Sequence, residues 1–246
     1  MSKKIPMKKQ RLDYFLIEHG DAADKREAFI IVTEGRVFVE GQKAISPAQM
    51  ILHSMLIKVK KPPAYVGRAA YKLDGAFKAF DVDVKGMVCI DIGAATGGFT
   101  QVALERGAVK VYAVDTAKGK LALKLREDPR VVVMEGTDIR HLEELPELAD
   151  IATIDISLIS LEDILPHAKR LLKPGGLVIA LFKPQYEVRD PSMLRHGIVK
   201  DDVSREHLLA DFTAWLDDNG WKIEGKIESP IRGSEGNVEY LFKLRP

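Results

Sequence analysis

Apolar positions follow two different patterns along the chain, and the change between them lies near residue 60. Before it, apolar residues recur at helical spacing over 11–18 and 24–34, and short apolar runs at 36–41 and 55–59 indicate strands. After residue 67, apolar runs typical of buried strands alternate with helical patterns, which predicts a parallel sheet with helices on both faces. The predicted strands are 87–92, 109–114, 131–134, 151–154, 177–181, 221–227 and 238–242, and the predicted helices are 99–106, 119–126, 160–172 and 203–218. We therefore expect an α/β, Rossmann-like fold with a mostly parallel seven-stranded sheet that ends in a hairpin, preceded by a small α+β unit.

The boundary between the two patterns carries prolines and basic residues. Pro62 and Pro63 disfavour helix and follow Lys58, Lys60 and Lys61, a composition typical of a semi-rigid linker. We therefore expect an N-terminal domain at 1–60, a linker at 61–66 and a larger domain at 67–246.

Charge is divided unevenly between these two parts. The 246 residues contain 37 Lys and Arg against 36 Asp and Glu, so no chain-wide cationic field attracts a nucleic acid. Residues 1–61, however, hold 12 Lys and Arg and 7 Asp and Glu, a net charge of +5. The remaining residues hold 25 Lys and Arg and 29 Asp and Glu, a net charge of −4. A nucleic-acid partner is therefore expected to be recognised locally, through the basic N-terminal part.

The sequence contains neither an export signal nor a membrane-spanning pattern. The basic start is followed by no apolar run, and nowhere do about 18 apolar residues occur consecutively. The single cysteine, Cys89, lies in an apolar run and is interpreted as a buried, inert thiol, so no disulfide framework is expected. None of the six histidines has metal-ligand spacing. We expect a cytoplasmic protein with neither a metal nor a membrane partner.

The strongest local motif follows the predicted strand 87–92. Its sequence, Asp91-Ile-Gly-Ala-Ala-Thr-Gly-Gly-Phe99, joins an apolar strand to a helix, which is the context of a nucleotide-binding loop. The G-x-G-x-x-G spacing that seats a pyrophosphate is absent, and the Asp91 carboxylate would repel a phosphate. A carboxylate at this place suits a cationic ligand such as the amino-acid part of S-adenosylmethionine (SAM). The predicted cofactor contacts in this loop are Asp91, Gly93, Ala94, Thr96, Gly97, Gly98 and Phe99.

Two further carboxylates follow the next two strands. Asp115 comes directly after the strand 109–114 and can accept hydrogen bonds from both ribose hydroxyls of a cofactor, a role that by itself does not separate NAD from SAM. Asp138 is placed to receive an adenine amino group, or alternatively caps a helix or turn.

The end of the fourth strand narrows the class of methyl acceptor. It reads Asp155-Ile-Ser157 and lacks the Asp/Asn-Pro-Pro-Tyr/Phe pattern of enzymes that methylate exocyclic amines of bases. The thiol-dependent route to carbon 5 of pyrimidines lacks a nucleophile, because Cys89 lies in a core strand. A hydroxyl group is therefore the leading candidate.

The N-terminal part resembles the alpha-L motif, the small RNA-binding module named after the fourth small-subunit ribosomal protein. The resemblance rests on Arg11-Leu-Asp-x-Phe-Leu, Lys25-Arg-Glu-Ala and Gly35-Arg-Val, and it departs at Asp24 and Glu40, where Ser and Asn are usual. It implies a basic surface that contacts RNA phosphates, the alternative being ordinary solvated helix faces. The candidate RNA-binding residues are Arg11, Lys25, Arg26, Arg36, Lys60, Lys61 and Arg68.

Residues 67–246 resemble the FtsJ-type ribose 2′-O-methyltransferases, and the whole chain resembles the TlyA (haemolysin A) family of rRNA methyltransferases. The motifs that carry this resemblance are Gly67-Arg-Ala-Ala-Tyr-Lys-Leu, the loop 91–99, Ile154-Asp-Ile-Ser, Phe182-Lys-Pro-Gln-Tyr-Glu and the segment from Ser229-Pro-Ile through Gly236-Asn-Val-Glu-Tyr. The resemblance implies SAM as cofactor, ribosomal RNA or ribosomal subunits as partner, and cytidine as the methylated nucleotide. It also implies a catalytic tetrad of Lys72, Asp155, Lys183 and Glu239, in which Asp155 also contacts the cofactor and Lys183 acts as base or stabilises the developing alkoxide.

Two other interpretations stay open from the sequence alone. The historical name of the family suggests a membrane-active haemolysin, which the lack of a spanning segment disfavours. A SAM-binding ribosome assembly factor with little catalysis would keep the same fold, and the intact tetrad disfavours it.

Overall fold

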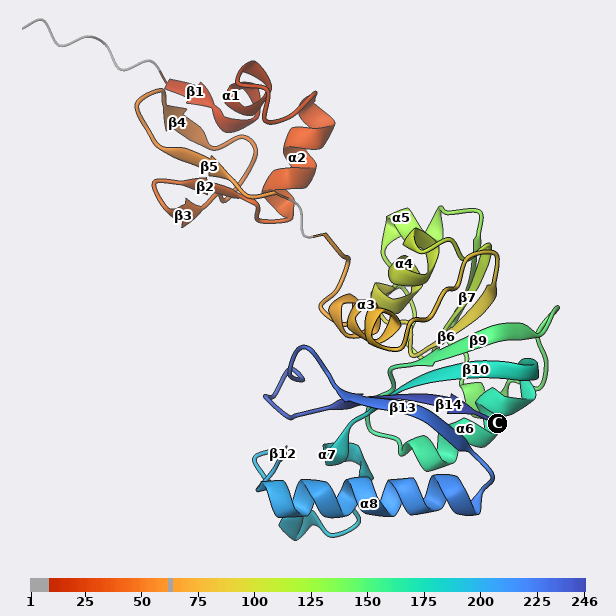
Figure 1. Cartoon of the computed structure of the whole chain (residues 1–246). Helices are drawn as coiled ribbons and strands as arrows, with labels where there is room; N and C mark the ends of the chain where they lie inside the picture. Colours follow the sequence, from red (N-terminus) through yellow and green to blue (C-terminus); the bar gives the residue numbers. More distant parts are fainter. Residues whose placement is uncertain (1–8, 62–63) are drawn as a thin grey trace, which may run out of the picture. The chain divides into compact units, whose positions relative to one another are not determined.

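The computed structural model describes residues 9–61 and 64–246, and the chain divides into two compact units between Ala64 and Tyr65 (Figure 1). Each unit has its own hydrophobic core. The centre of the predicted linker, at 62–63, lies outside the described residues, as does the basic start of the chain. None of the described helices is long and apolar enough to span a bilayer.

In the N-terminal unit, two helices pack against short strands. The helices α1 (Leu12–Glu18) and α2 (Lys25–Thr33) agree with the predicted ranges. The strand β2 (Val37–Val39) pairs with β3 (Gln42–Lys43) and β5 (Ile57–Val59), while β1 (Lys9–Arg11) pairs with β4 (Met50–Leu52). The sequence did not predict β1, β3 and β4, because two or three residues are too few to show a period of two.

Both departures from the alpha-L pattern have a local explanation. Asp24 is the N-cap of α2, where its side chain accepts a hydrogen bond from the Glu27 amide at 2.8 Å, a role that Asp and Ser perform about equally well. Glu40 has a left-handed backbone, with φ of 49°, in the turn between β2 and β3. Its carboxylate accepts a hydrogen bond from the Leu56 amide at 2.6 Å, which ties this turn to the next strand. The two substitutions therefore preserve the local fold.

The second unit is built on a seven-stranded sheet with the order β13-β14-β10-β9-β6-β7-β8. Five strands are parallel, and β14 lies antiparallel to both of its neighbours, which confirms the predicted mostly parallel sheet with a final hairpin. The strands are β6 (Val88–Ile92), β7 (Lys110–Asp115), β8 (Val131–Glu135), β9 (Ala149–Ile154), β10 (Leu172–Phe182), β13 (Lys222–Glu228) and β14 (Tyr240–Arg245). All carboxyl ends of the parallel strands lie at one edge, where ligands bind in open α/β sheets.

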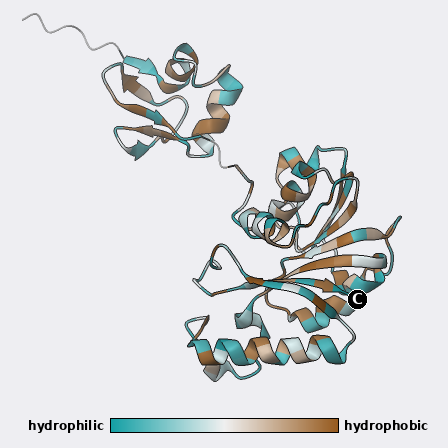
Figure 2. Cartoon of the chain, viewed as in Figure 1, coloured by the Kyte–Doolittle hydropathy of each residue, from teal (hydrophilic) through white to brown (hydrophobic). Residues whose placement is uncertain are grey.

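Helices cover both faces of this sheet, as the alternating pattern predicted. On one face, α3 (Ala70–Ala79), α4 (Gly98–Glu105) and α5 (Leu123–Arg126) contribute to one apolar cluster, and on the other α6 (Leu161–Arg170) and α8 (Asp202–Asp218) contribute to a second. Figure 2 shows that hydrophobic residues are concentrated in the central strands. Cys89 lies inside this core with 1% exposure, which confirms that it is buried, and this burial raises the pKa of its thiol to about 12.

The predicted helix 119–126 is shortened to the four residues of α5 because a carboxylate from a strand holds its first half. Both oxygens of Glu135, at the end of β8, accept hydrogen bonds from the amides of Gly119, Lys120 and Leu121 at 2.8–2.9 Å. These bonds, with the Arg126 guanidinium, lower the pKa of Glu135 to about 2. The segment before α5 is therefore a carboxylate-bound turn, which no periodicity could reveal.

Short elements follow β8 and β10. They are the 3-10 helix η1 (Ile139–His141), the single turn α7 (Pro184–Glu187), the 3-10 helix η2 (Pro191–Met193) and the hairpin β11 (Leu194–Arg195) with β12 (Ile198–Val199). The buried Asn237, 2% exposed, fixes this hairpin: its side chain accepts from the Val199 amide at 3.1 Å and donates to the Gly197 carbonyl at 2.9 Å.

Candidate active site

The loop between β6 and α4 begins at the carboxyl edge of the sheet, and its turns depend on glycine. Gly93 and Gly97 have φ of 88° and 93°, in the left-handed region that glycine adopts without strain. A Cβ on Gly93 would lie 2.4 Å from the Asp155 carbonyl oxygen, so only glycine allows this loop to approach the end of β9. The loop and the exit of β9 are thereby held against each other.

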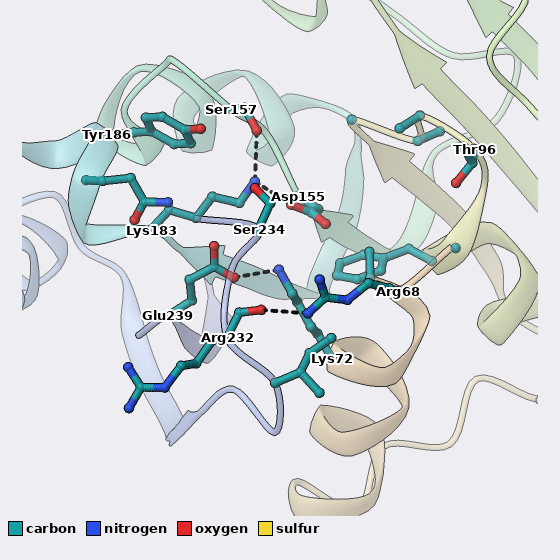
Figure 3. A pocket seen from close by; sticks show the side chains of 18 residues that line it. Arg68, Lys72, Thr96, Asp155, Ser157, Lys183, Tyr186, Arg232, Ser234 and Glu239 are labelled. Atoms are coloured by element: carbon teal, nitrogen blue, oxygen red, sulfur yellow. Dashed lines mark hydrogen bonds and ion pairs between the residues drawn. The ribbon is translucent and has the colours of Figure 1, made fainter. Parts of the chain in front are cut away.

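Two hollows of about 260 and 220 Å³ open beside this loop. They share Gly93, Ala95, Asp155 and Ser157 as a common wall. The first, which we call the tetrad hollow, contains all four predicted catalytic side chains (Figure 3). The second, which we call the carboxylate hollow, contains Asp115 and Asp138 between apolar walls from β6, β7, η1 and α6. Together they fall within the range of about 300–1,000 Å³ that is usual for small-molecule sites.

Most predicted cofactor residues line these hollows, but Asp91 and Gly97 line neither. Asp91 is 1% exposed and points into the core, where its carboxylate accepts a hydrogen bond from the Thr100 hydroxyl at 2.6 Å. Burial, with added repulsion from Asp155, raises the pKa of Asp91 to about 7. The structure therefore places Asp91 beneath the loop, where its hydroxyl partner lies at the start of α4, and does not bring it to the surface of the site.

Asp115 and Asp138 line the carboxylate hollow, and both already accept hydrogen bonds within the protein. The two oxygens of Asp115 accept from the amides of Ala95 and Ala117 at 2.7 Å each. Asp138 caps η1 and forms a bidentate pair with Arg140, which lowers the pKa of its carboxyl to about 2. The capping alternative for Asp138 is thus present in the structure, together with its position in the hollow.

The four tetrad side chains form two lysine–carboxylate pairs. Lys72 of α3 lies 2.5 Å from Glu239, which directly precedes β14, and Lys183 at the end of β10 lies 2.6 Å from Asp155 at the end of β9. Lys183 also donates to the Ser157 hydroxyl at 3.0 Å. Lys72, Lys183 and Glu239 are 8%, 7% and 2% exposed. Charged groups are costly to bury, so two such pairs in one cavity mark a candidate functional site.

Several residues of the tetrad hollow were not among the predicted site residues. Ser157, Gln185, Tyr186, Arg232 and Ser234 line it. The Gln185 Oε1 atom is buried and has no hydrogen-bond partner among the described residues, a state that costs about 1–3 kcal/mol until a donor arrives. Gln185 and Tyr186 lie in the same short motif as Lys183, and Arg232 lies in the segment 229–240 that contains Glu239, so their positions in these motifs could have suggested them.

Glu187 connects the two loops that carry Lys183 and Asp155. Its carboxylate accepts hydrogen bonds from the Ser160 hydroxyl and from the Leu161 amide, the latter at 3.0 Å. Burial raises the pKa of Glu187. The chain segment after Lys183 is therefore tied to the start of α6, six residues beyond Asp155.

The predicted RNA-binding residues fall into both units. Arg11 and Lys25 lie beside the half-exposed Tyr14 ring, with Lys25 Nζ 4.6 Å from its centroid, and Lys60 Nζ lies 4.5 Å from the Phe38 ring. Arg26 and Lys61 are exposed, and Arg36 pairs with Glu34 and donates to the Lys60 carbonyl. Arg68 belongs to the second unit and lines the tetrad hollow.

The described residues contain no cluster of three or more His, Cys, Asp or Glu side chains arranged to hold a metal ion.

Comparison with known proteins gives the family of the chain. Residues 65–245 match the model of the FtsJ-like methyltransferases. The 16S/23S rRNA (cytidine-2′-O)-methyltransferase TlyA of Mycobacterium tuberculosis is 37% identical over 97% of this chain and 90% of its own length. Hemolysin A of Brachyspira hyodysenteriae is 37% identical over 94% of this chain and 98% of its own. YqxC of Bacillus subtilis, provisionally named an rRNA methyltransferase, is 40% identical over 96% of this chain and 86% of its own length.

A solved structure from Streptococcus thermophilus is provisionally titled a hemolysin. The match covers 97% of this chain and 88% of the solved chain, with 38% identity and a TM-score of 0.72. An S-adenosylmethionine-dependent methyltransferase from Mesorhizobium loti shares the fold at 18% identity, covering 70% of this chain and 96% of its own with a TM-score of 0.52. Relatives with methyltransferase names and with hemolysin names match the same span, so the two names label one family. The chain therefore belongs to the FtsJ-like methyltransferases and, within them, to the TlyA (haemolysin A) family.

Proposed function

We propose that the chain transfers the methyl group of SAM to a ribose 2′-hydroxyl of ribosomal RNA, at a cytidine, as the name of its mycobacterial relative suggests. The observation that carries the proposal is the tetrad hollow, where two buried lysine–carboxylate pairs lie next to the carboxylate hollow. Ribosomal subunits or their RNA are the partners, and the cytoplasm, where subunits are assembled, is the expected location.

The methyl donor of the enzyme is SAM, and the donor set of the two hollows fits it. Apolar side chains of the carboxylate hollow, such as Val114, Ile139 and Ile156, suit the faces of a purine, and Asp115 suits ribose hydroxyls because each carboxylate oxygen can accept more than one hydrogen bond. The amides at the start of α4 suit the carboxylate of an amino acid. When bound, SAM supplies an electrophilic methyl group on its sulfonium sulfur.

Lys183 is the proposed contact for the acceptor hydroxyl. A ribose hydroxyl is a poor nucleophile at neutral pH, so it needs a base or stabilisation of the charge that develops on its oxygen. An ammonium group has three donors, and Lys183 Nζ directs two of them at Asp155 and Ser157. The third remains for the acceptor oxygen, which places Lys183 either as the stabiliser of the alkoxide or, once it has lost a proton, as the base.

Lys72 and Glu239 act as the second pair in this proposal. Glu239 is 2% exposed and keeps the Lys72 ammonium in place at 2.5 Å. Lys72 then adds a positive charge to the same hollow. The carboxylate of Glu239 is paired with this ammonium, so it does not stand free to repel the developing oxyanion. Positioning the hydroxyl between the two pairs lowers the barrier in the way that preorganised charges do.

We propose that residues 1–60 form an RNA-binding domain, which the linker 61–66 joins to the catalytic domain at 67–246. The N-terminal unit supplies exposed cations for the RNA backbone. Lys25 and Arg26 are exposed at the start of α2, and Tyr14 adds an aromatic surface beside Lys25. Such a surface suits phosphates and unstacked bases of folded RNA.

The test is methyl transfer from tritiated SAM to subunits from a strain that lacks this gene, with mapping of the 2′-O-methyl positions. Lys183→Ala should reduce turnover by at least about 100-fold, because one acid–base group contributes about 10²–10⁴-fold, while calorimetry shows nearly unchanged SAM affinity. Lys169→Ala, an exposed lysine of α6, is the matched control.

Retained turnover in Lys183→Ala would remove the role assigned to this residue. SAM binding by the wild type without transfer would instead support the assembly-factor interpretation. Leakage of liposomes caused by the purified protein would support the haemolysin interpretation.

A further inference from the structure

The charges in the tetrad hollow do not balance. Its charged side chains are Arg68, Lys72, Asp155, Lys183, Arg232 and Glu239. Lys72 and Lys183 are neutralised by Glu239 and Asp155. Arg68 and Arg232 are left, and among the described residues neither guanidinium has a carboxylate within ion-pair distance. Glu235 lies on the same loop as Arg232 but does not line the hollow. The hollow therefore presents two uncompensated cations at its rim.

These two cations come from different elements that the structure joins. Arg68 lies two residues before the first residue of α3, and Arg232 lies in the loop 229–239 between β13 and β14. The Arg68 guanidinium donates to the Arg232 backbone carbonyl at 3.4 Å, while the Arg232 guanidinium points away from this contact (Figure 3). Both side chains are exposed. Because the Arg232 guanidinium donates to the Gly236 carbonyl at 3.2 Å, each guanidinium has one backbone partner, and the pair offers its remaining N–H groups along the rim of one hollow.

The loop that carries Arg232 is fixed rather than free. Gly233 packs so closely against the tetrad that a Cβ on it would lie 2.5 Å from Glu239 Oε1. The Ser229 hydroxyl donates to the Ile231 carbonyl at 2.7 Å, and Asn237 ties the end of the loop to the hairpin of β11 and β12. Arg232 is therefore held beside the reacting groups, where a ligand would meet it without prior folding of the loop.

We propose that Arg68 and Arg232 bind the phosphodiester groups on either side of the acceptor ribose. SAM carries a net positive charge and does not complement them, whereas a second ligand that brings negative charge does. Guanidinium groups bind phosphate oxygens through paired hydrogen bonds. Two phosphate contacts would set the ribose in position over Lys183 and would act on any RNA sequence, because phosphate contacts position a nucleic acid and carry no base information. This inference rests on the proposed function.

The test compares Arg232→Ala and Arg232→Lys with Arg170→Ala, an exposed arginine at the end of α6 that lines neither hollow. Methyl transfer to subunits is measured at several salt concentrations. Arg232→Ala should raise KM for subunits about five- to tenfold and reduce the slope of log KM against log salt by about one, with SAM affinity unchanged. Arg232→Lys should keep the slope, because it keeps the charge, and should restore part of KM.

Binding of the same subunits at the same salt concentrations is measured beside the transfer assay. If the wild type transfers no methyl group, the proposed function fails, and the salt slope of binding still decides the role of Arg232. An unchanged slope in Arg232→Ala, or an equal change in Arg170→Ala, would overturn the phosphate assignment.

Discussion

Two lysines of the catalytic unit and two of the N-terminal unit occupy opposite environments. In the catalytic unit, Lys72 and Lys183 are 8% and 7% exposed, and each lies within 2.6 Å of a carboxylate. In the N-terminal unit, Lys25 and Lys60 are exposed and lie over aromatic rings. Burying a charge pair costs free energy, whereas an exposed cation costs almost none. The comparison shows that the lysines expected to take part in chemistry are buried at a cost in free energy, whereas those expected to attract a polyanion are exposed at almost no cost.

The largest effect is expected from breaking a buried pair. Glu239→Ala leaves the Lys72 ammonium buried without a partner and should lower the free energy of unfolding by about 3–5 kcal/mol. Arg189→Ala breaks the exposed pair with Glu162, in which Arg189 is 87% exposed, and should cost less than about 1 kcal/mol.

Urea unfolding followed by tryptophan fluorescence measures both variants, because Trp215 and Trp221 both lie in the catalytic unit. Similar losses in Glu239→Ala and Arg189→Ala would contradict the distinction between buried and exposed pairs.

A smaller effect is expected from the buried carboxyl of Asp91. Because its pKa is raised from the ordinary value near 4 to about 7, the folded protein keeps a proton there that the unfolded chain has already released. Asp91 therefore lowers the stability as pH rises from about 4 to 7, by on the order of a few kcal/mol. Asp91→Asn should remove this decline in urea unfolding measured across that range.

Asp138→Asn is the matched control for this pH dependence. The pKa of Asp138 is lowered to about 2, so its contribution is present above pH 4 and is lost as pH falls through about 2. Between pH 4 and 7, this variant should leave the slope of the wild type unchanged. Parallel stability curves for Asp91→Asn and the wild type would contradict the protonation of Asp91 in the folded state.

The smallest effect in free energy is expected from the exposed cations of the N-terminal unit. Replacing Lys25, Arg26 and Arg36 with Glu should weaken RNA binding about tenfold or more and reduce its salt dependence, with SAM affinity unchanged. Because Arg36 also donates to the Lys60 carbonyl, the double variant Lys25→Glu with Arg26→Glu separates charge from local structure. Reversal of Lys169, Arg170 and Lys222, exposed in the catalytic unit, is the control. An equal loss of RNA affinity in the two sets of variants would show that RNA is attracted by positive charge anywhere on the chain and not by the N-terminal unit in particular.

Most of the fold followed from the sequence because its signals are local. Apolar runs revealed every strand of the seven-stranded sheet, and the helical patterns revealed the coverage of both faces. The strands β1, β3 and β4 were missed because they are too short to show a period, and the other failures came from contacts between distant residues. Glu135 replaced a predicted helical turn by binding three amides at 119–121, and no pattern within 119–126 announces a partner in a neighbouring strand.

The tetrad could be suggested from the sequence because each member lies in a recognisable motif, and the structure brings all four together in one hollow. Asp91 was interpreted as facing the ligand because the loop was considered alone. Its partners, Thr100 and Thr153, lie nine and 62 residues away, and they hold the carboxylate inside the core. Arg232 was missed because only the folded loop brings it beside Arg68, 164 residues earlier.

Asp155 stands on the wall common to both hollows while it pairs with Lys183. Whatever fills the carboxylate hollow changes the electrostatic surroundings of this single carboxylate, and through it the lysine that would meet the acceptor. Thermodynamic linkage then requires the reverse: an occupant of the tetrad hollow alters the affinity of the other hollow by the same factor. The binding affinities of the two substrates would therefore be coupled through one side chain, without any movement of the sheet that carries it.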